Sequence, residues 1–362
     1  MTWRRGTISK PGRAWLGGAE WWVTIDGTEH LALAYTDLVG SLEVGDEVAV
    51  NTTATDRGLG TGGYALIVSA SSLPEPRTGP GHIVKARYMP QQAMVMAVDE
   101  PDSPHYDILA AAESLDGMPV VVADLHSALP AIVACATHDA PGIRIAYIHT
   151  DTAALPLAFS RTAAALRERG DITTITSGQS FGGDFESVNL HTALLAARHV
   201  IGADIAVVVQ GPGNVGTGTA WGFSGTAVGE AINAINLLGG TAIATLRVSQ
   251  ADARPRHLGI SHHSLTAYTK VALTPALVPI TSENIDPDIL AVIESRYPTL
   301  TGTGRLTLVE VDGIRAGLSS SAVPLRTMGR GLVDDYAAFA FAGAGGVLAA
   351  GLVAETSSPG AD

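Results

Sequence analysis

Charged side chains are scarce in this chain of 362 residues, where Asp, Glu, Lys and Arg together make up 16%. Average globular domains carry roughly a quarter. Basic residues are the scarcer kind: 22 Lys and Arg stand against 35 Asp and Glu, for a formal net charge of −13. Because no Lys/Arg cluster offsets this charge, we expect no nucleic-acid partner. The hydrophobic share of 46% excludes a disordered chain.

Cysteine is nearly absent as well. The single residue, Cys135, cannot form an intrachain disulfide, and its small apolar neighbours predict a buried, inert thiol. The N-terminal residues lack the apolar run of a signal peptide. The longest uncharged stretch, residues 337–353, is shorter than the roughly 20 residues of a membrane span and predicts a buried helix that packs through small residues. We therefore expect a cytoplasmic protein without a membrane partner.

The first part of the chain, residues 1–75, has the pattern of a small all-β module. Short β-rich runs at 21–25, 29–35, 47–51 and 64–69 are separated by Gly and Asp turns. Such spacing predicts a small barrel or sandwich, better suited to packing or to contacts in a homo-oligomer than to ligand binding. Residues 71–82 are rich in Pro, Gly and Ser and read as a linker within a connecting segment, 76–116.

From residue 117 to 362 the pattern changes to repeated strand, loop and helix. Apolar runs without alternation predict strands that are covered on both faces. Their regular alternation with helices predicts an α/β domain with a doubly wound, mainly parallel, Rossmann-like sheet and a C-terminal helix. The predicted strands are 119–123, 144–148, 172–176, 205–209, 241–248 and 305–311, and the predicted helices are 128–136, 156–169, 185–199 and 226–238.

Polar side chains collect directly after these predicted strands, where open α/β sheets bind their ligands. In a chain so poor in charge, this concentration is the strongest functional signal. Neutral imidazoles and carboxylates at one sheet edge can act as general acids and bases. The candidate catalytic residues are His126, Asp151, His257, His262 and His263.

A glycine-rich loop follows the strand 205–209, and Gly211, Gly213 and Gly216 match G-x-G-x-x-G. Such a loop brings backbone N–H groups close to a phosphate. A further Gly/Thr-rich stretch separates the motif from its helix, and no acidic residue ends the next strand, which weakens a dinucleotide interpretation. Tight packing of a helix on the sheet remains an alternative role for the glycines. The candidate ligand-binding residues are Gly211, Gly213, Asn214, Gly216, Thr217, Gly218, Thr219, Arg254, Arg256 and Gln179.

Histidines and carboxylates at the same edge could also hold Zn²⁺ or Mn²⁺. No H-E-x-x-H occurs, so the presence of a metal, like that of a nucleotide, stays open. Asp184 is expected to cap the helix 185–199. The candidate metal ligands are His126, Asp184, Glu186, His262 and His263.

Several phrases resemble a bacterial family known as domain of unknown function 3866. They are LHSALP (125–130), ALPLAFSR (154–161), GQSFGGD (178–184), QGPGNVGTGT (210–219), RHLGISHHS (256–264) and TMGRG (327–331). The resemblance implies a bacterial source and supplies no activity or cofactor.

The pocket pattern itself predicts a protein that binds an anionic small molecule, a nucleotide or another phosphate compound, as a hydrolase or transferase. A non-catalytic assembly or regulatory protein and an NAD(P)-dependent oxidoreductase are the alternatives.

Overall fold

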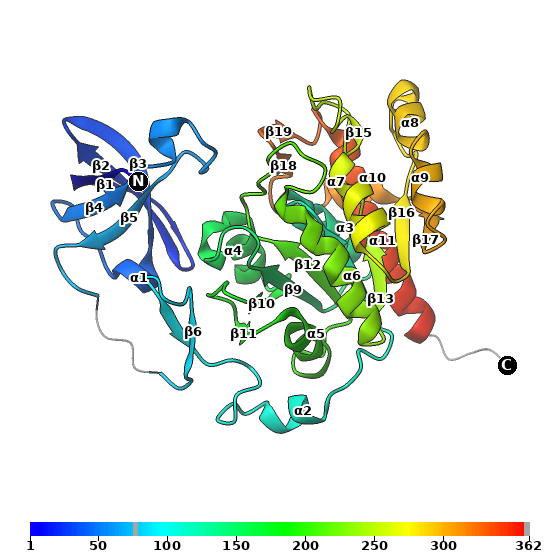
Figure 1. Ribbon diagram of the computed structural model, residues 1–362, viewed down its shortest axis with the longest axis horizontal. Helices are drawn as coiled ribbons and strands as arrows, with labels where there is room; N and C mark the ends of the chain where they lie inside the picture. Colours follow the sequence, from blue (N-terminus) through cyan, green and yellow to red (C-terminus); the bar gives the residue numbers. More distant parts are fainter. Residues whose placement is uncertain (75–78, 358–362) are drawn as a thin grey trace.

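A computed structural model describes residues 1–74 and 79–357, in which a small barrel precedes a large α/β domain (Figure 1). Five strands close the barrel in the order β1-β2-β3-β5-β4, so the predicted N-terminal barrel module is confirmed. All pairings are antiparallel except that of β3 with β5, and β1 closes the barrel by pairing with both β2 and β4. This order is that of an OB-type Greek-key barrel. Its elements are β1 (Trp3–Trp15), β2 (Gly18–Ile25), β3 (Thr28–Tyr35), α1 (Thr36–Val39), β4 (Glu47–Asn51), a 3₁₀ turn (Thr55–Arg57) and β5 (Ala65–Ala70).

The barrel contacts the α/β domain near the outer strands β10 and β11 of the large sheet (Figure 1). Trp15 Nε1 donates to the carbonyl of Ala158 at 2.6 Å, and Arg161 lies 3.7 Å from the buried Glu20. The chain between the two parts forms β6 (Ile83–Lys85), β7 (Ala93–Val95) and α2 (Tyr106–Ala111). Residues 75–78, within the predicted linker 71–82, lie outside the described residues.

Eight parallel strands form the central sheet, in the order β11-β10-β9-β12-β8-β13-β16-β17. The predicted doubly wound α/β fold is therefore confirmed. The strands are β8 (Pro119–Ala123), β9 (Ile145–Thr150), β10 (Thr173–Ser177), β11 (Phe185–Ser187), β12 (Ile205–Gln210), β13 (Thr241–Ala244), β16 (Ala276–Ile280) and β17 (Leu306–Glu310). Two separate ribbons are built from strands of two residues each: β14 (Val248–Ser249) pairs with β15 (Gly259–Ile260), and β18 (Arg326–Thr327) pairs with β19 (Arg330–Gly331).

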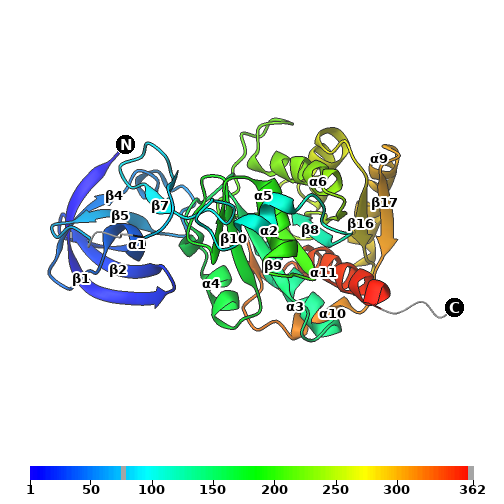
Figure 2. The ribbon, with the colours of Figure 1, turned by 90° about the horizontal axis from the view of Figure 1, so that it is seen from below.

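Helices cover both faces of this sheet (Figure 2). Alternate residues of β8 show the two cores: Val120 and Val122 pack into one cluster, and Val121 and Ala123 into the other. One face carries α5 (Leu190–His199), α6 (Ala227–Leu237), α7 (His262–Thr266), the π-helical turn Ala267–Val271, α8 (Pro287–Glu294) and α9 (Tyr297–Thr301). The other carries α3 (Leu129–Asp139), α4 (Arg161–Glu168), α10 (Ile314–Ser319) and α11 (Tyr336–Ser357). Short 3₁₀ turns at His126–Ala128, Leu157–Phe159 and Ser224–Thr226 lead into α3, α4 and α6.

The uncharged stretch 337–353 lies in α11, whose length and composition would suffice to cross a membrane. Most of the helix is nevertheless buried, as the sequence predicts. Gly343 and Gly346 permit close packing on α3, because a Cβ at either position would collide with Cys135 or with the backbone of α3. Cys135 itself is fully buried, and burial raises the pKa of its thiol to about 12, as expected for an inert cysteine.

Three local predictions are wrong. The helix 185–199 begins only at Leu190, because residues 185–187 pair with β10 as strand β11. Its N-cap is Asn189, whose side chain accepts from Thr192 N, whereas Asp184 accepts from Thr174 and pairs with Arg167. The strand 241–248 ends at Ala244, and the chain then turns towards β14.

Candidate functional site

At one place along the carboxyl edge of the sheet, the chain leaves neighbouring strands towards opposite faces. Strand β12 lies between β9 and β8. The chains that leave β8 and β9 form α3 and α4 on one face, whereas the chain that leaves β12 forms α6 on the other. Open α/β sheets bind ligands at such switch points. The candidate site lies among the loops that follow β8, β12 and β13.

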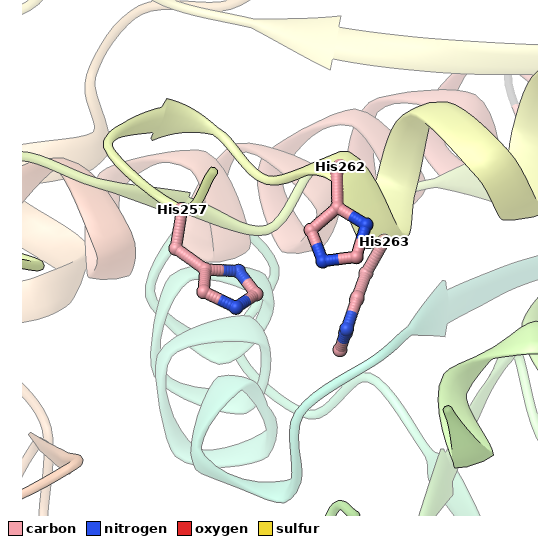
Figure 3. Close-up of side chains that lie close together, drawn as sticks. All are labelled: His257, His262 and His263. Atoms are coloured by element: carbon pink, nitrogen blue, oxygen red, sulfur yellow. The ribbon is translucent and has the colours of Figure 1, made fainter. Parts of the chain in front are cut away.

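A small cavity at this edge is lined by three histidines and three arginines; we call it the histidine pocket. Its volume is about 80 Å³. The ring centroids of His257 and His262 are 5.0 Å apart, as are those of His257 and His263, and those of His262 and His263 are 4.5 Å apart. Figure 3 shows the three rings turned towards a common space. The lining residues are Leu125, Asn214, Gly216, Gly218, Arg247, Arg254, Arg256, His257, His262, His263 and Met328.

The local fold explains why three histidines from one segment converge. Strands β14 and β15 pair antiparallel and return the chain to the sheet edge, where α7 starts at once with His262. Ser261 is the N-cap of α7: its Oγ accepts from His263 N at 3.2 Å and lies 2.7 Å from His257 Nδ1. One serine hydroxyl therefore holds the loop histidine against the first turn of the helix.

Asp124, the first residue after β8, links the pocket to the sheet. Its carboxylate accepts from Asn214 Nδ2 at 2.6 Å and from Arg247 Nη1 at 3.2 Å, and Oδ2 lies 3.2 Å from His263 Nδ1. Burial acts to raise the pKa of this carboxyl, but His263 and Arg247 outweigh it and the pKa is lowered. Asp124 is thus an ionised group that positions Arg247 and His263.

Two histidines of the pocket, His257 and His262, are neutral near pH 7. Burial, with the nearby Arg247, lowers the pKa of His257 to about 3, and burial with the His263 ring also lowers the pKa of His262. Arg256 Nε lies 3.3 Å from His257 Nε2, and because a guanidinium can only donate, this nitrogen carries the lone pair. The proton of His257 is therefore on Nδ1, which donates to Ser261.

The glycine-rich loop forms one wall of the pocket. It folds back on itself, since Thr217 N donates to Gly222 O and Ser224 N donates to Val215 O. Phe223 then stacks on His263 with ring centroids 3.8 Å apart and planes inclined by 6°. The motif does not open directly into a helix, because α6 starts only at Ala227.

The individual residues of this loop have different roles. Gly211 is a packing glycine, since a Cβ there would lie 2.6 Å from His149 Cε1, and Gly213 adopts φ +107° in open space. Gly216 and Gly218 reach the pocket. The hydroxyls of Thr217 and Thr219 lie 3.2 Å apart within the exposed loop. Within the described residues, no hydrogen bond engages the N–H groups of Gly216 and Gly218.

His126 belongs to a different, inward-facing network. Its Nε2 lies 2.6 Å from Ser160 Oγ, and its Nδ1 lies 3.2 Å from the hydroxyl of Tyr147, which is also 3.0 Å from His149 Nδ1. Burial lowers the pKa of His126 to about 3 and that of His149 to about 4. His126 does not line the histidine pocket. Ser160 is the N-cap of α4.

The remaining predicted site residues lie nearer the barrel. Asp151 accepts from Gln179 N at 2.8 Å, and Gln179 Oε1 accepts from Arg87 N at 3.1 Å. Asp151 also lines a second cavity, of about 350 Å³, between the starts of α5 and α6. Glu186 forms an ion pair with Lys85 at 2.7 Å, and Asp184 pairs with Arg167. Neither carboxylate joins the three histidines, which are the metal-competent His/Cys/Asp/Glu group found among the described residues.

Sequence reasoning missed Arg247 as a pocket residue and Phe223 as the ring that stacks on His263. Arg247 could have been found, because a charge within the otherwise uncharged run 241–248 is unusual in a charge-poor chain. Phe223 gave no such signal, since its contact with His263 depends on how the loop folds back.

Comparison with known proteins gives a match to a family model. No curated protein matches it. A family model does match, over residues 31–346, which include β4, β5 and most of β3 of the barrel, but not β1 or β2, and every residue of the histidine pocket. The chain therefore belongs to the family described as "Protein of unknown function (DUF3866)".

Proposed function

We propose that the histidine pocket binds the phosphate or a similar anionic group of a small molecule. One observation carries the proposal: the lining contains three arginines, three histidines and no carboxylate, in a chain whose net charge is −13. Arg247 and Arg254 are neutralised by Asp124 and Asp252. Arg256 has no carboxylate partner within the described residues, so its charge is available to a ligand.

Hydrogen-bond donors surround the same space. Gly216 and Gly218 line the pocket together with Arg256, and their N–H groups make no hydrogen bond within the described residues; loop N–H groups of this kind bind phosphate oxygens. A Cβ on Gly218 would lie 3.5 Å from Arg256 Nη1, so the loop and the arginine approach each other closely.

The size of the pocket limits what it encloses. A volume of about 80 Å³ holds one phosphate-sized group, so the rest of a nucleotide or other phosphate compound would extend outside it. Neutral histidines beside a bound phosphate can serve as general bases, which favours a hydrolase or transferase. The expected setting is the cytoplasm, with the barrel available for contacts in a homo-oligomer.

The two alternatives have less support. An NAD(P)-dependent oxidoreductase needs the pyrophosphate at a helix N-terminus, and here the glycine motif leads into a folded-back loop instead. A non-catalytic assembly protein would not need three histidines around a cavity whose lining contains no carboxylate.

Isothermal titration of inorganic phosphate and pyrophosphate into the metal-free full chain, at pH 7 and low salt, tests the proposal. Loss of one charge-assisted hydrogen bond costs about 1.5–3 kcal/mol, so Arg256→Ala should weaken binding by roughly tenfold or more. Arg57→Ala is the matched control, because Arg57 is exposed in the barrel, remote from the pocket. Absence of binding by the wild-type chain, or equal weakening by both substitutions, would contradict the proposal.

A further inference from the structure

We propose that His257, His262 and His263 form a binding site for a divalent transition-metal ion of the Zn²⁺ class. One ring nitrogen of each lies within 4.8 Å of the corresponding nitrogens of the other two. Small side-chain rotations would bring three such atoms to the roughly 2.0–2.1 Å that Zn–N bonds require. The proposal goes beyond anion binding, because a metal can bind here whether or not phosphate does.

The hydrogen bonds around His262 and His257 leave a ring nitrogen of each able to bind a cation. His262 Nε2 is buried and has no hydrogen-bond partner. His257 carries its lone pair on Nε2, since Nδ1 donates to Ser261. A buried polar atom without a partner is costly and calls for a missing ion or water, and imidazole is a preferred ligand of Zn²⁺, Cu²⁺ and Ni²⁺.

Metal-binding histidines commonly donate their second ring N–H to a carboxylate, and Asp124 is placed to accept such a hydrogen bond from His263. Its Oδ2 lies 3.2 Å from His263 Nδ1, on the side of the ring away from Nε2. Arg247 Nη1 lies 2.9 Å from the same Nδ1, so a proton on Nδ1 that points to Asp124, with the Nε2 lone pair left for a metal, requires this guanidinium to turn away from the ring.

Arg256 is the group that must move. Its Nε donates to His257 Nε2, so it occupies the position that a metal would take, and its charge repels a cation. The side chain is exposed and can swing away at little cost. Three protein ligands then leave a fourth position open to water or to an anion. Arg256 should therefore oppose the metal and favour phosphate, which separates the two proposals experimentally.

The experiment uses the tag-free full chain, stripped with a chelator and dialysed. Zn²⁺ binding is measured by competition with a coloured chelator and by metal analysis, and Co²⁺ binding by its visible absorption. We expect one Zn²⁺ per chain. His262→Ala should weaken binding by at least roughly 100-fold, more than the 10–100-fold that loss of an outer-shell partner costs. His257→Ala should do the same, and circular dichroism checks that both variants fold. His138→Ala, at an exposed position in α3, is the matched control and should change nothing.

Arg256→Ala provides the second readout: it should tighten Zn²⁺ binding several-fold while it weakens phosphate binding. The metal site is overturned if the wild-type chain binds no Zn²⁺, or if both pocket variants bind it as tightly as His138→Ala. Zn²⁺ binding without phosphate binding would refute only the anion proposal. Phosphate binding to a chain that takes up no Zn²⁺ would refute only the metal site.

Discussion

Lys85→Met should lower the free energy of unfolding by about 3 kcal/mol. The ammonium of Lys85 is fully buried, 2.7 Å from Glu186, and donates to the carbonyls of Thr176 and Ser180 at 3.0 and 2.7 Å. Loss of one partner of a buried ion pair costs about 3–5 kcal/mol. The lower value applies because Glu186 still accepts from Thr176 Oγ1 and from Gly182 N. This buried cation attaches the connecting segment to β10 and β11, together with the bridge of Ala97 to Glu186 and the hydrogen bond from Val98 N to Glu186 O.

Urea unfolding of Lys85→Met, Glu186→Gln and the double variant measures this contribution. Because removal of both charges leaves no buried unpaired ion, the double variant should be more stable than the sum of the single losses predicts, by about 1–3 kcal/mol. Lys270→Met, which removes an exposed lysine in the π-helical turn, is the control and should cost less than about 1 kcal/mol. A loss below about 1 kcal/mol for Lys85→Met, or strictly additive effects, would refute the reasoning.

Two further predictions concern the buried histidines and the packing of α11. Burial lowers the folded-state pKa of His126, His149 and His257 to about 3, 4 and 3, against 6.5 for an ordinary histidine. The unfolded chain therefore binds more protons below pH 6.5. The free energy of unfolding should fall by up to about 1.4 kcal/mol per pH unit for each histidine as the pH drops towards 4. Urea unfolding at several pH values should show a shallower decline for His126→Gln, and an unchanged slope would contradict the assignment. Gly346→Ala should cost about 1–3 kcal/mol, because its Cβ meets a backbone carbonyl of α3. Gly351→Ala, in open space on the same helix, should stabilise the protein by about 0.5–1 kcal/mol in thermal unfolding; equal effects would argue against the close contact.

The fold class could be predicted because buried parallel strands are continuous apolar runs. Strand β8 matches its predicted bounds, 119–123, and β12 differs by one residue. Strand β1 was not predicted, since its 13 residues include Gly and Pro at irregular points of the pairing with β2. Strand β16 contains Pro279 and was also missed. Strand β11 resembles a helix start in sequence, and only its pairing with β10 distinguishes it.

The candidate site was predicted in part, for a related reason. His257, His262 and His263 are close in sequence, so one hairpin and one helix start bring them together. His126 follows a neighbouring strand, yet its ring turns inward to Tyr147 and Ser160. Sequence patterns place residues at a sheet edge but leave open which way each strand-end loop turns. That direction depends on hydrogen bonds between segments far apart in the chain.

An anomalous difference map from crystals of the full chain soaked in tungstate, a heavy-atom analogue of phosphate, tests the central claim most directly. The account predicts one dominant peak in the histidine pocket, within hydrogen-bonding distance of Arg256 and of the N–H groups of Gly216 and Gly218. The same soak of Arg256→Ala crystals should show that peak strongly reduced. A dominant peak elsewhere, for instance in the cavity beside Asp151, or an unchanged peak in the variant, would contradict the assignment of the pocket as an anion site.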